Sequence, residues 1–349
     1  MRKLLLTLVV IFVVSGVGLA IVGSVVWGRL HEPFKGYAGE EQFVEIPAGA
    51  GTNEIGRLLV EAKVVRDPLV FRAGMLWTGR RRTLKAGEYR FARPLSAAEV
   101  IDIVARGEVH ARRITFPEGL TIVDMSKIYE SRGFGPASDF VRAASDGSAV
   151  ADLDPSAQDL EGYLFPETYA LPRGTPAARL IDQMVRNFRA AYTEDLRAQA
   201  AAQELSTREV VTIASLVEKE TGKAEERTLV AAVYRNRLRI GMGMQADPTI
   251  IYALQKAGKY DGNIRRADLR LDSPYNTYRY AGLPPGPIAS PGKASLAAAL
   301  APADVKHLYF VSRNDGSHVF ADTLAEHNRN VRRFQVLYFR EKRLKAGTR

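Results

Sequence analysis

Two glutamates, Glu218 and Glu220, stand at the end of an apolar run, ASLVEKETG. Ser206 and Glu209 form a capping-box pattern, which predicts that a helix begins just after Ser206. On a helical wheel of about 100° per residue, both carboxylates fall within the broad apolar arc, and Lys219 falls outside it. A carboxylate on an apolar face loses water, so its pKa rises and it can hold a proton near neutral pH, as a general acid must.

A second interpretation of these glutamates is a helix end that emerges from the core, where they pair with arginines. Positions two apart on a helix do not face each other, so the two carboxylates are not a close acid–nucleophile couple. Gly222 is typical of a helix C-cap. The next predicted helix is rich in arginines, which could neutralise glutamates or hold an anionic ligand: Arg227, Arg235, Arg237 and Arg239. The wheel alone does not choose between Glu218 and Glu220.

A long loop, DSPYNTYRYAGLPPGPIASPG, follows this helical region. Its five prolines predict an ordered backbone. Tyr275, Tyr278 and Tyr280 offer flat faces against which a sugar ring can stack. Asn276 and Thr277 offer amide and hydroxyl contacts. The alternative interpretation is a purely structural crossover loop.

The elements that position these residues begin with an apolar N-terminal segment. Residues 4–28 carry no charge and would span about 37 Å as a helix, enough for a bilayer core of about 30 Å. A cleaved signal peptide is the alternative, but its apolar region is usually only about 7–15 residues long. Arg2 and Lys3 favour a short cytoplasmic tail, residues 1–3. We therefore expect a single-pass protein of the inner (cytoplasmic) membrane whose bulk is extracytoplasmic, in the periplasm.

Beyond the span, the pattern predicts an α+β fold in two parts. Residues 29–41 look like a linker, and residues 42–108 follow the order strand, helix, helix, strand, helix. Caps are predicted at Asp67-Pro68 and at Ser96 with Glu99. This unit resembles LysM-type glycan-binding modules, with a small α+β spacer as the alternative. Residues 109–345 are expected to form a mixed α+β catalytic domain.

Three local patterns add detail to that second domain. A long helix is predicted from about Thr175 to Ala202. Asp247-Pro248 is typical of an N-cap followed by the first helical residue. Asn314-Asp315-Gly316 predicts the turn of a β-hairpin.

Composition limits the chemistry. The 349 residues include 49 Lys plus Arg, 39 Asp plus Glu and no Cys, giving a net charge of +10. Disulfides, thiolate metal sites and a cysteine nucleophile are excluded. The positive charge indicates an anionic partner, and an extracytoplasmic location makes wall polymer or lipid a better candidate than nucleic acid. His318 and His327 are too isolated to predict a metal site, and P-loop, Gly-x-Ser-x-Gly and His-Glu-x-x-His motifs are absent.

Several strings occur together and in order: ASLVEKETG, VYRNRLRIGMGMQADPTIIYAL, SPYNTY, GLPPGPIASPG, and an ending LYFVS with EHN. In these strings the chain resembles the endolytic murein transglycosylase family, the YceG-like proteins. The resemblance implies a membrane anchor, a LysM-like subdomain and a catalytic domain that cleaves peptidoglycan glycan strands near the membrane. It also implies that Glu218 is the catalytic glutamate and that no metal or organic cofactor takes part.

The implied reaction needs one carboxylic acid. Glu218 would protonate the glycosidic oxygen between MurNAc and GlcNAc, and the MurNAc 6-hydroxyl would attack its own anomeric carbon to leave a 1,6-anhydroMurNAc end. The candidates for positioning the sugar are Asn236, Gln245, Asp247, Tyr275, Asn276 and Tyr278. We expect a role in terminating the elongation of nascent strands. The alternatives are a hydrolytic muramidase and a non-catalytic, membrane-anchored wall-binding scaffold that recruits peptidoglycan synthases or division proteins.

Overall fold

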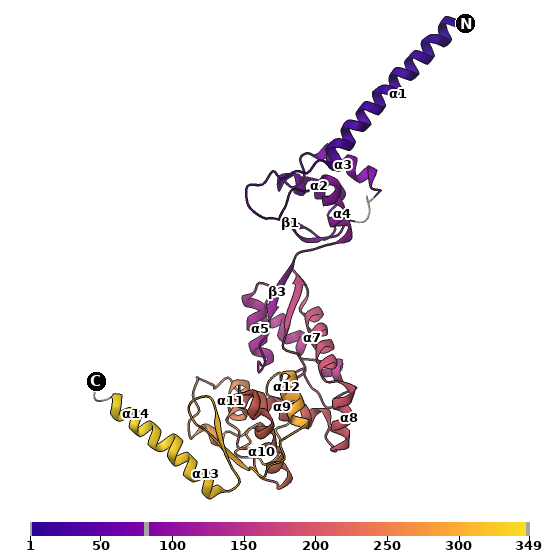
Figure 1. Ribbon diagram of the computed structural model, residues 1–349. Helices are drawn as coiled ribbons and strands as arrows, with labels where there is room; N and C mark the ends of the chain where they lie inside the picture. Colours follow the sequence, from indigo (N-terminus) through magenta and orange to yellow (C-terminus); the bar gives the residue numbers. More distant parts are fainter. Residues whose placement is uncertain (1, 80–83, 347–349) are drawn as a thin grey trace. The chain divides into compact units, whose positions relative to one another are not determined.

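The computed structural model describes residues 2–79 and 84–346, and it has the mixed α+β character expected from the sequence. The chain divides into two compact units (Figure 1). Unit 1 comprises Met1–Arg113 with Ala170–Gly174, and unit 2 comprises Ile114–Tyr169 with Thr175–Arg349. Within the described residues, three two-stranded sheets follow one another along the chain: β1-β2, β3-β4 and β5-β6.

Helix α1 (Arg2–His31) carries the predicted apolar segment. Its stretch Phe12–His31 is long and apolar enough to cross a membrane, and no other helix in residues 2–79 and 84–346 meets that criterion. Apolar side chains from Phe12 to Val26 are exposed. A helix that exposes such a surface is a candidate for burial in lipid.

The C-terminal end of α1 packs into unit 1. Leu30 is buried, and the ring of Trp27 meets that of Trp77 edge-on at 4.8 Å. Further along, Phe34 bridges to Leu95, and the hydroxyl of Tyr37 donates to the Phe91 carbonyl at 3.0 Å. We expected a linker over residues 29–41, but these contacts hold much of that segment against the unit.

Unit 1 has the element order predicted for residues 42–108. Its elements are β1 (Gln42–Ile46), α2 (Thr52–Glu61), α3 (Pro68–Trp77), β2 (Gly87–Phe91) and α4 (Ala97–Arg106). Strands β1 and β2 pair antiparallel, with Val44 opposite Tyr89. Both of these side chains are buried, and they share one core with Leu59, Phe71 and Val100.

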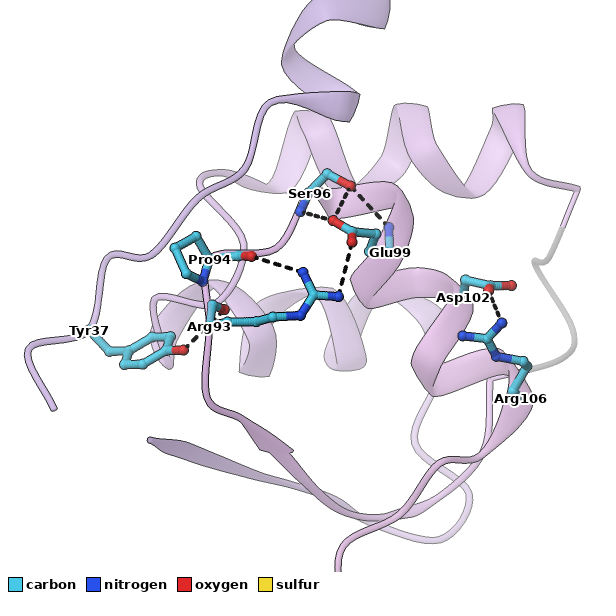
Figure 2. A network of polar contacts seen from close by, with 7 residues as sticks. All are labelled: Tyr37, Arg93, Pro94, Ser96, Glu99, Asp102 and Arg106. Carbon is cyan, nitrogen blue, oxygen red and sulfur yellow. Dashed lines mark hydrogen bonds and ion pairs between the residues drawn. The ribbon is translucent and has the colours of Figure 1, made fainter. Parts of the chain in front are cut away.

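The predicted capping box of α4 is present, as Figure 2 shows. The Ser96 N–H donates to Glu99 Oε2 at 2.8 Å, and the Glu99 N–H donates to Ser96 Oγ at 3.3 Å. Arg93 donates to the same carboxylate at 3.2 Å. The hydrogen bond from the Ser96 backbone lowers the pKa of Glu99. The helix ends at Gly107, whose φ of 74° favours glycine.

Unit 2 begins in strand β3 (Ala111–Thr115), which pairs with β4 (Thr168–Pro172). Its first helices are α5 (Ile122–Ser131), α6 (Ala137–Ala144), α7 (Ala177–Ala191) and α8 (Glu194–Ala202). The prediction of a single helix over 175–202 is therefore wrong, because two helices, α7 and α8, occupy this range. Tyr192 leaves the helical conformation with ψ of 72°, and Thr193 then caps α8 by accepting from the Leu196 N–H.

Helix α9 (Thr207–Glu220) is the central element of unit 2, and Ser206 with Glu209 forms its predicted capping box. All residues from Val210 to Val217 are buried. The one-sided arc expected from the wheel is thus too narrow, because α8, α10 (Arg227–Arg239), α11 (Asp247–Lys256) and α12 (Lys293–Leu300) all pack on α9. The helix ends at Glu220 with Thr221 extended, so Gly222 is not its cap.

The predicted hairpin is confirmed as β5 (Tyr309–Ser312) paired antiparallel with β6 (His318–Ala321). Asn314 and Gly316 in its turn both have positive φ. Helix α13 (Leu324–Val331) follows and continues through a π-helical turn, Arg332–Leu337, into α14 (Tyr338–Ala346).

Candidate active site

Glu218 lies on the last turn of α9, with its side chain only 7% exposed. Its Oε2 accepts a hydrogen bond from the backbone N–H of Gly292 at 2.9 Å. Its Oε1 lies 3.9 Å from Nη2 of Arg227, near the start of α10. The helix terminus thus presents one nearly buried carboxylate, fixed by a backbone donor.

Two loops meet around this carboxylate. The Gly119 N–H donates to the Ser290 carbonyl at 2.9 Å, and the Ser290 N–H donates to the Leu120 carbonyl at 2.8 Å. The second loop is also tied to α9, because the Ile288 N–H donates to Ser215 Oγ at 3.1 Å. These bonds fix residues 288–292, part of the proline-rich loop, alongside the helix that carries Glu218.

Glu220 enters a different environment. Its Oε2 accepts from the Tyr234 hydroxyl at 3.2 Å. Burial raises the pKa of Glu220 to about 7. The residue lines a cavity of about 480 Å³, together with Gln245, Asp247, Tyr278, Arg237, Tyr309, His327 and Asn328 among others. Three of the predicted sugar-positioning residues are therefore gathered at Glu220.

Gln245 and Asp247 lie at the cavity because of the backbone conformation just before and at the start of α11. Gln245 has a positive φ of 47° and is exposed, with its N–H held by the Thr277 carbonyl at 3.2 Å. Asp247 is the first residue of α11, and Ala246 occupies the N-cap position. The expectation that Asp247 caps this helix is wrong, since its carboxylate instead accepts from the Tyr278 hydroxyl.

Asn276 is fully buried. Its amide nitrogen donates to the carbonyls of Leu269 at 3.1 Å and Leu271 at 2.8 Å, and its amide oxygen accepts from the Tyr278 N–H. Its amide groups are thus used by the backbone of the loop and of the segment just before it, and its role toward sugar stays a prediction. The side chain shapes the loop that carries Tyr278.

Tyr275 and Asn236 lie apart from the cavity at Glu220. The ring of Tyr275 packs on that of Tyr252 at 4.9 Å, below the ammonium of Lys256. Asn236, on α10, donates its amide to the carbonyls of Val305 at 2.8 Å and His307 at 3.0 Å. The structure therefore does not bring the six candidates into one cluster.

A further carboxylate that the sequence interpretation missed lies beside Glu218. Glu118 Oε2 is 3.9 Å from the same Nη2 of Arg227. Burial raises the pKa of Glu118, and the charge of Glu218 raises it further. The sequence offered a weak signal, Phe116-Pro117-x-Gly119, which is read most simply as a turn.

A second missed group surrounds Glu161, in the string LEGYLFPETYAL. Its carboxyl accepts from the Ile122 N–H at 3.1 Å and from the Tyr252 hydroxyl at 3.2 Å. Burial, followed by the charge of Asp159, raises the pKa of Glu161 to about 8. The residue lines a separate cavity of about 480 Å³.

Metal ligation has no candidate in the described part of the chain, where no group of three His, Asp or Glu side chains is suitably clustered.

Comparisons with known proteins agree with one another. A family model described as the YceG-like family matches residues 44–333. A protein of Bacillus subtilis (strain 168) named endolytic murein transglycosylase is 30% identical over 328 residues, which cover 89% of this chain and 90% of that protein. A protein of the same name from Streptococcus pneumoniae serotype 2 is 31% identical over 323 residues, but the match spans only 57% of its length. The crystal structure of a YceG-like protein from Listeria monocytogenes is similar with a TM-score of 0.58 at 30% identity, covering 84% of this chain and 99% of that one.

Proposed function

The chain belongs to the YceG-like family, and from that premise we propose that it is an endolytic murein transglycosylase. It cleaves the bond between MurNAc and GlcNAc within peptidoglycan glycan strands. The observation that carries the proposal is the state of Glu218, a carboxylate that is 7% exposed and fixed by the Gly292 N–H at 2.9 Å. A carboxylate withdrawn from water and held in place is suited to general acid–base catalysis.

Glu218 acts twice in the proposed reaction. Its carboxylic acid protonates the glycosidic oxygen, and the bond from that oxygen to the MurNAc anomeric carbon breaks. The MurNAc 6-hydroxyl then bonds to the anomeric carbon and gives its proton to the Glu218 carboxylate. The products are a 1,6-anhydroMurNAc end and a free GlcNAc 4-hydroxyl, and no water is consumed.

A single acid suffices because the nucleophile belongs to the substrate. Ordinary glycosidases need a second carboxylate as nucleophile or base. A tethered hydroxyl replaces it with a high effective molarity. Glu220 lies two residues further along the helix and accepts from Tyr234, so we assign it to the sugar-binding cleft.

The cleft at Glu220 binds the saccharide in this proposal. Its volume of about 480 Å³ lies within the range of small-molecule sites, about 300–1,000 Å³. Gln245, Asp247 and Tyr278 supply amide, carboxylate and phenol groups on its wall. Asn236, Tyr275 and Asn276 act at a distance, by supporting loops.

The proposed location of the protein is the inner membrane. Helix α1, with residues 4–28 in the bilayer and residues 1–3 in the cytoplasm, anchors the protein to the inner membrane and leaves residues 42–108 and 109–345 in the periplasm. The first of these two regions is a LysM-like glycan-binding subdomain, and the second is the catalytic domain. Cleavage close to the membrane would terminate the elongation of nascent strands, in proximity to peptidoglycan synthases.

The test is a product assay. Full-length protein in detergent micelles is incubated with peptidoglycan in water enriched in ¹⁸O, and the ends are identified by mass spectrometry. We expect 1,6-anhydroMurNAc ends without ¹⁸O, and none from Glu218→Gln. Reducing MurNAc ends that carry ¹⁸O would identify a hydrolytic muramidase instead. A Glu218→Gln protein that still sustains full function in cells would favour the wall-binding scaffold.

A further inference from the structure

Glu118 and Glu218 approach the same guanidinium. Arg227 Nη2 lies 3.9 Å from Oε2 of Glu118 and 3.9 Å from Oε1 of Glu218. The side chains of Arg227 and Glu218 are only 15% and 7% exposed, so water screens this pair weakly, whereas Glu118 is 46% exposed. Two carboxylates, one hundred positions apart in sequence, therefore compete for one positive charge.

Gly292 is the point at which the two carboxylates come together. Its N–H donates to Glu218 at 2.9 Å. A Cβ added to Gly292 would lie 1.8 Å from Oε1 of Glu118. The φ of Gly292 is −79°, which any residue adopts. The Glu118 carboxylate therefore occupies the space of a side chain at this position, and a residue larger than glycine would displace it.

The loop that carries Glu118 is fixed on two sides. Lys219 Nζ donates to the Gly119 carbonyl at 3.0 Å. The Gly119 N–H donates to the Ser290 carbonyl at 2.9 Å. Glu118 is thus positioned by the same helix and the same loop that position Glu218.

This arrangement answers a difficulty in the proposed chemistry. A general acid must carry a proton, but an arginine beside a carboxyl group favours the ionised form. A second carboxylate on the same arginine offsets that effect, because two ionised carboxylates repel each other. We propose that Glu118 is a positioning residue of the active centre, which shares Arg227 with Glu218 and thereby keeps one proton on the carboxylate pair. This inference rests on the proposed function.

The charges around Glu118 fit this role. Burial raises the pKa of Glu118, Glu218 raises it further, and Arg227 opposes both. Lys219 directs its ammonium to the Gly119 carbonyl. Arg227 Nε is buried and has no hydrogen-bond partner among the described residues. Glu118 and Glu218 are the ion-pair partners of Arg227 in the described part of the chain.

The first test is the pH profile of Glu118→Gln in the full-length protein, measured as release of 1,6-anhydroMurNAc ends. Without the Glu118 charge, Arg227 acts on Glu218 alone, and the repulsion that favours a proton on the carboxylate pair is lost. We expect the alkaline limb of kcat/KM to move about one pH unit lower, with activity about tenfold down at pH 8 and nearly unchanged at pH 5. Glu225→Gln is the matched control, because it removes the same charge from an exposed position seven residues beyond Glu218.

The possible results separate the two proposals. The role of Glu118 would be overturned if the alkaline limb of Glu118→Gln stays in place. It would also be overturned if this variant loses the same fraction of activity at every pH. Wild-type protein that releases no anhydro ends would instead overturn the proposed function. Equal thermal unfolding midpoints for Glu118→Gln and wild type would show that the shift does not come from unfolding.

A second test moves Glu118 without removing its charge. Gly292→Ala places a methyl group where the Glu118 carboxylate lies, and the Glu118 side chain, 46% exposed, has room to swing away. We expect Gly292→Ala to shift the alkaline limb of kcat/KM in the same direction as Glu118→Gln. The double variant, Glu118→Ala with Gly292→Ala, should have the same pH profile as Glu118→Ala alone. Additive losses in the double variant would contradict a shared mechanism.

Discussion

The phenol of Tyr278 donates a hydrogen bond to the carboxylate of Asp247, 31 positions earlier in the chain. Burial, followed by this hydrogen bond, raises the pKa of Tyr278, so the phenol keeps its proton. Thr277 strengthens the junction, because its hydroxyl accepts from the Ala246 N–H at 3.1 Å and pairs with the Thr249 hydroxyl at 2.8 Å. The tyrosine loop and the start of α11 therefore form one wall of the cleft.

Removing the Tyr278 hydroxyl tests this wall. Tyr278→Phe keeps the ring but frees the Asp247 carboxylate, at a cost of about 1–2 kcal/mol in transition-state binding. We expect kcat/KM for release of anhydro ends to fall about tenfold, and the thermal midpoint to change little. Tyr280→Phe is the control, since Tyr280 is exposed and bonds to Asp272 outside the cleft. Equal losses in both variants would argue against a specific role for Tyr278.

The two glutamates of α9 are predicted to differ in their contributions. Glu218→Gln removes the proposed acid, and we expect a loss in kcat of at least about a hundredfold. Glu220→Gln alters the cleft, and we expect a rise in KM with a smaller loss in kcat. Steady-state kinetics on defined glycan strands separates the two effects. A larger loss in kcat for Glu220→Gln than for Glu218→Gln would assign the acid to Glu220, whose pKa burial raises to about 7.

Asn276 is predicted to act on stability. Asn276→Ala removes the donors of two loop carbonyls, Leu269 and Leu271, at a cost of about 1–3 kcal/mol. We expect a lower thermal midpoint in calorimetry, with lost activity partly restored by cooling. Asn263→Ala, at an exposed position, should leave the midpoint in place. An inactive Asn276→Ala protein of wild-type stability would instead indicate contact with substrate.

Glu161 is predicted to make stability depend on pH. Its pKa of about 8 in the folded protein lies above the ordinary value of 4.5. The folded state therefore binds the extra proton between these two values, and stability falls as the pH rises through that window. The difference in the free energy of unfolding between Glu161→Gln and wild type should therefore increase in favour of the variant by on the order of 3 kcal/mol from pH 5 to pH 9. Chemical denaturation at several pH values measures this gain, and a constant difference across the range would contradict it.

Much of the local structure follows from the sequence. The capping boxes at Ser96 and Ser206 and the turn after Ser312 depend on residues a few positions apart, and the structure contains them. The break at Tyr192 was missed because the apolar pattern continues through it, and only the Thr193 cap marks the start of α8.

The contacts of the candidate site are harder to predict from the sequence, because the residues that interact there lie far apart in the chain. Glu118 and Glu218, one hundred positions apart, approach the same arginine, and no local pattern pairs them. Asn276 has the residue type of a sugar ligand, but the carbonyls that use its amide are fixed by the folded loop. Residue type thus indicates what a side chain can bind, and the fold decides which partner reaches it first.

The last turn of α1 packs into the core of unit 1. Leu30 is buried in the unit, and Trp27 packs on Trp77 before the helix ends at His31. In the proposed membrane-anchored protein, this packing would join unit 1 directly to the end of the span. The glycan that unit 1 can reach would then be the glycan nearest to the lipid surface.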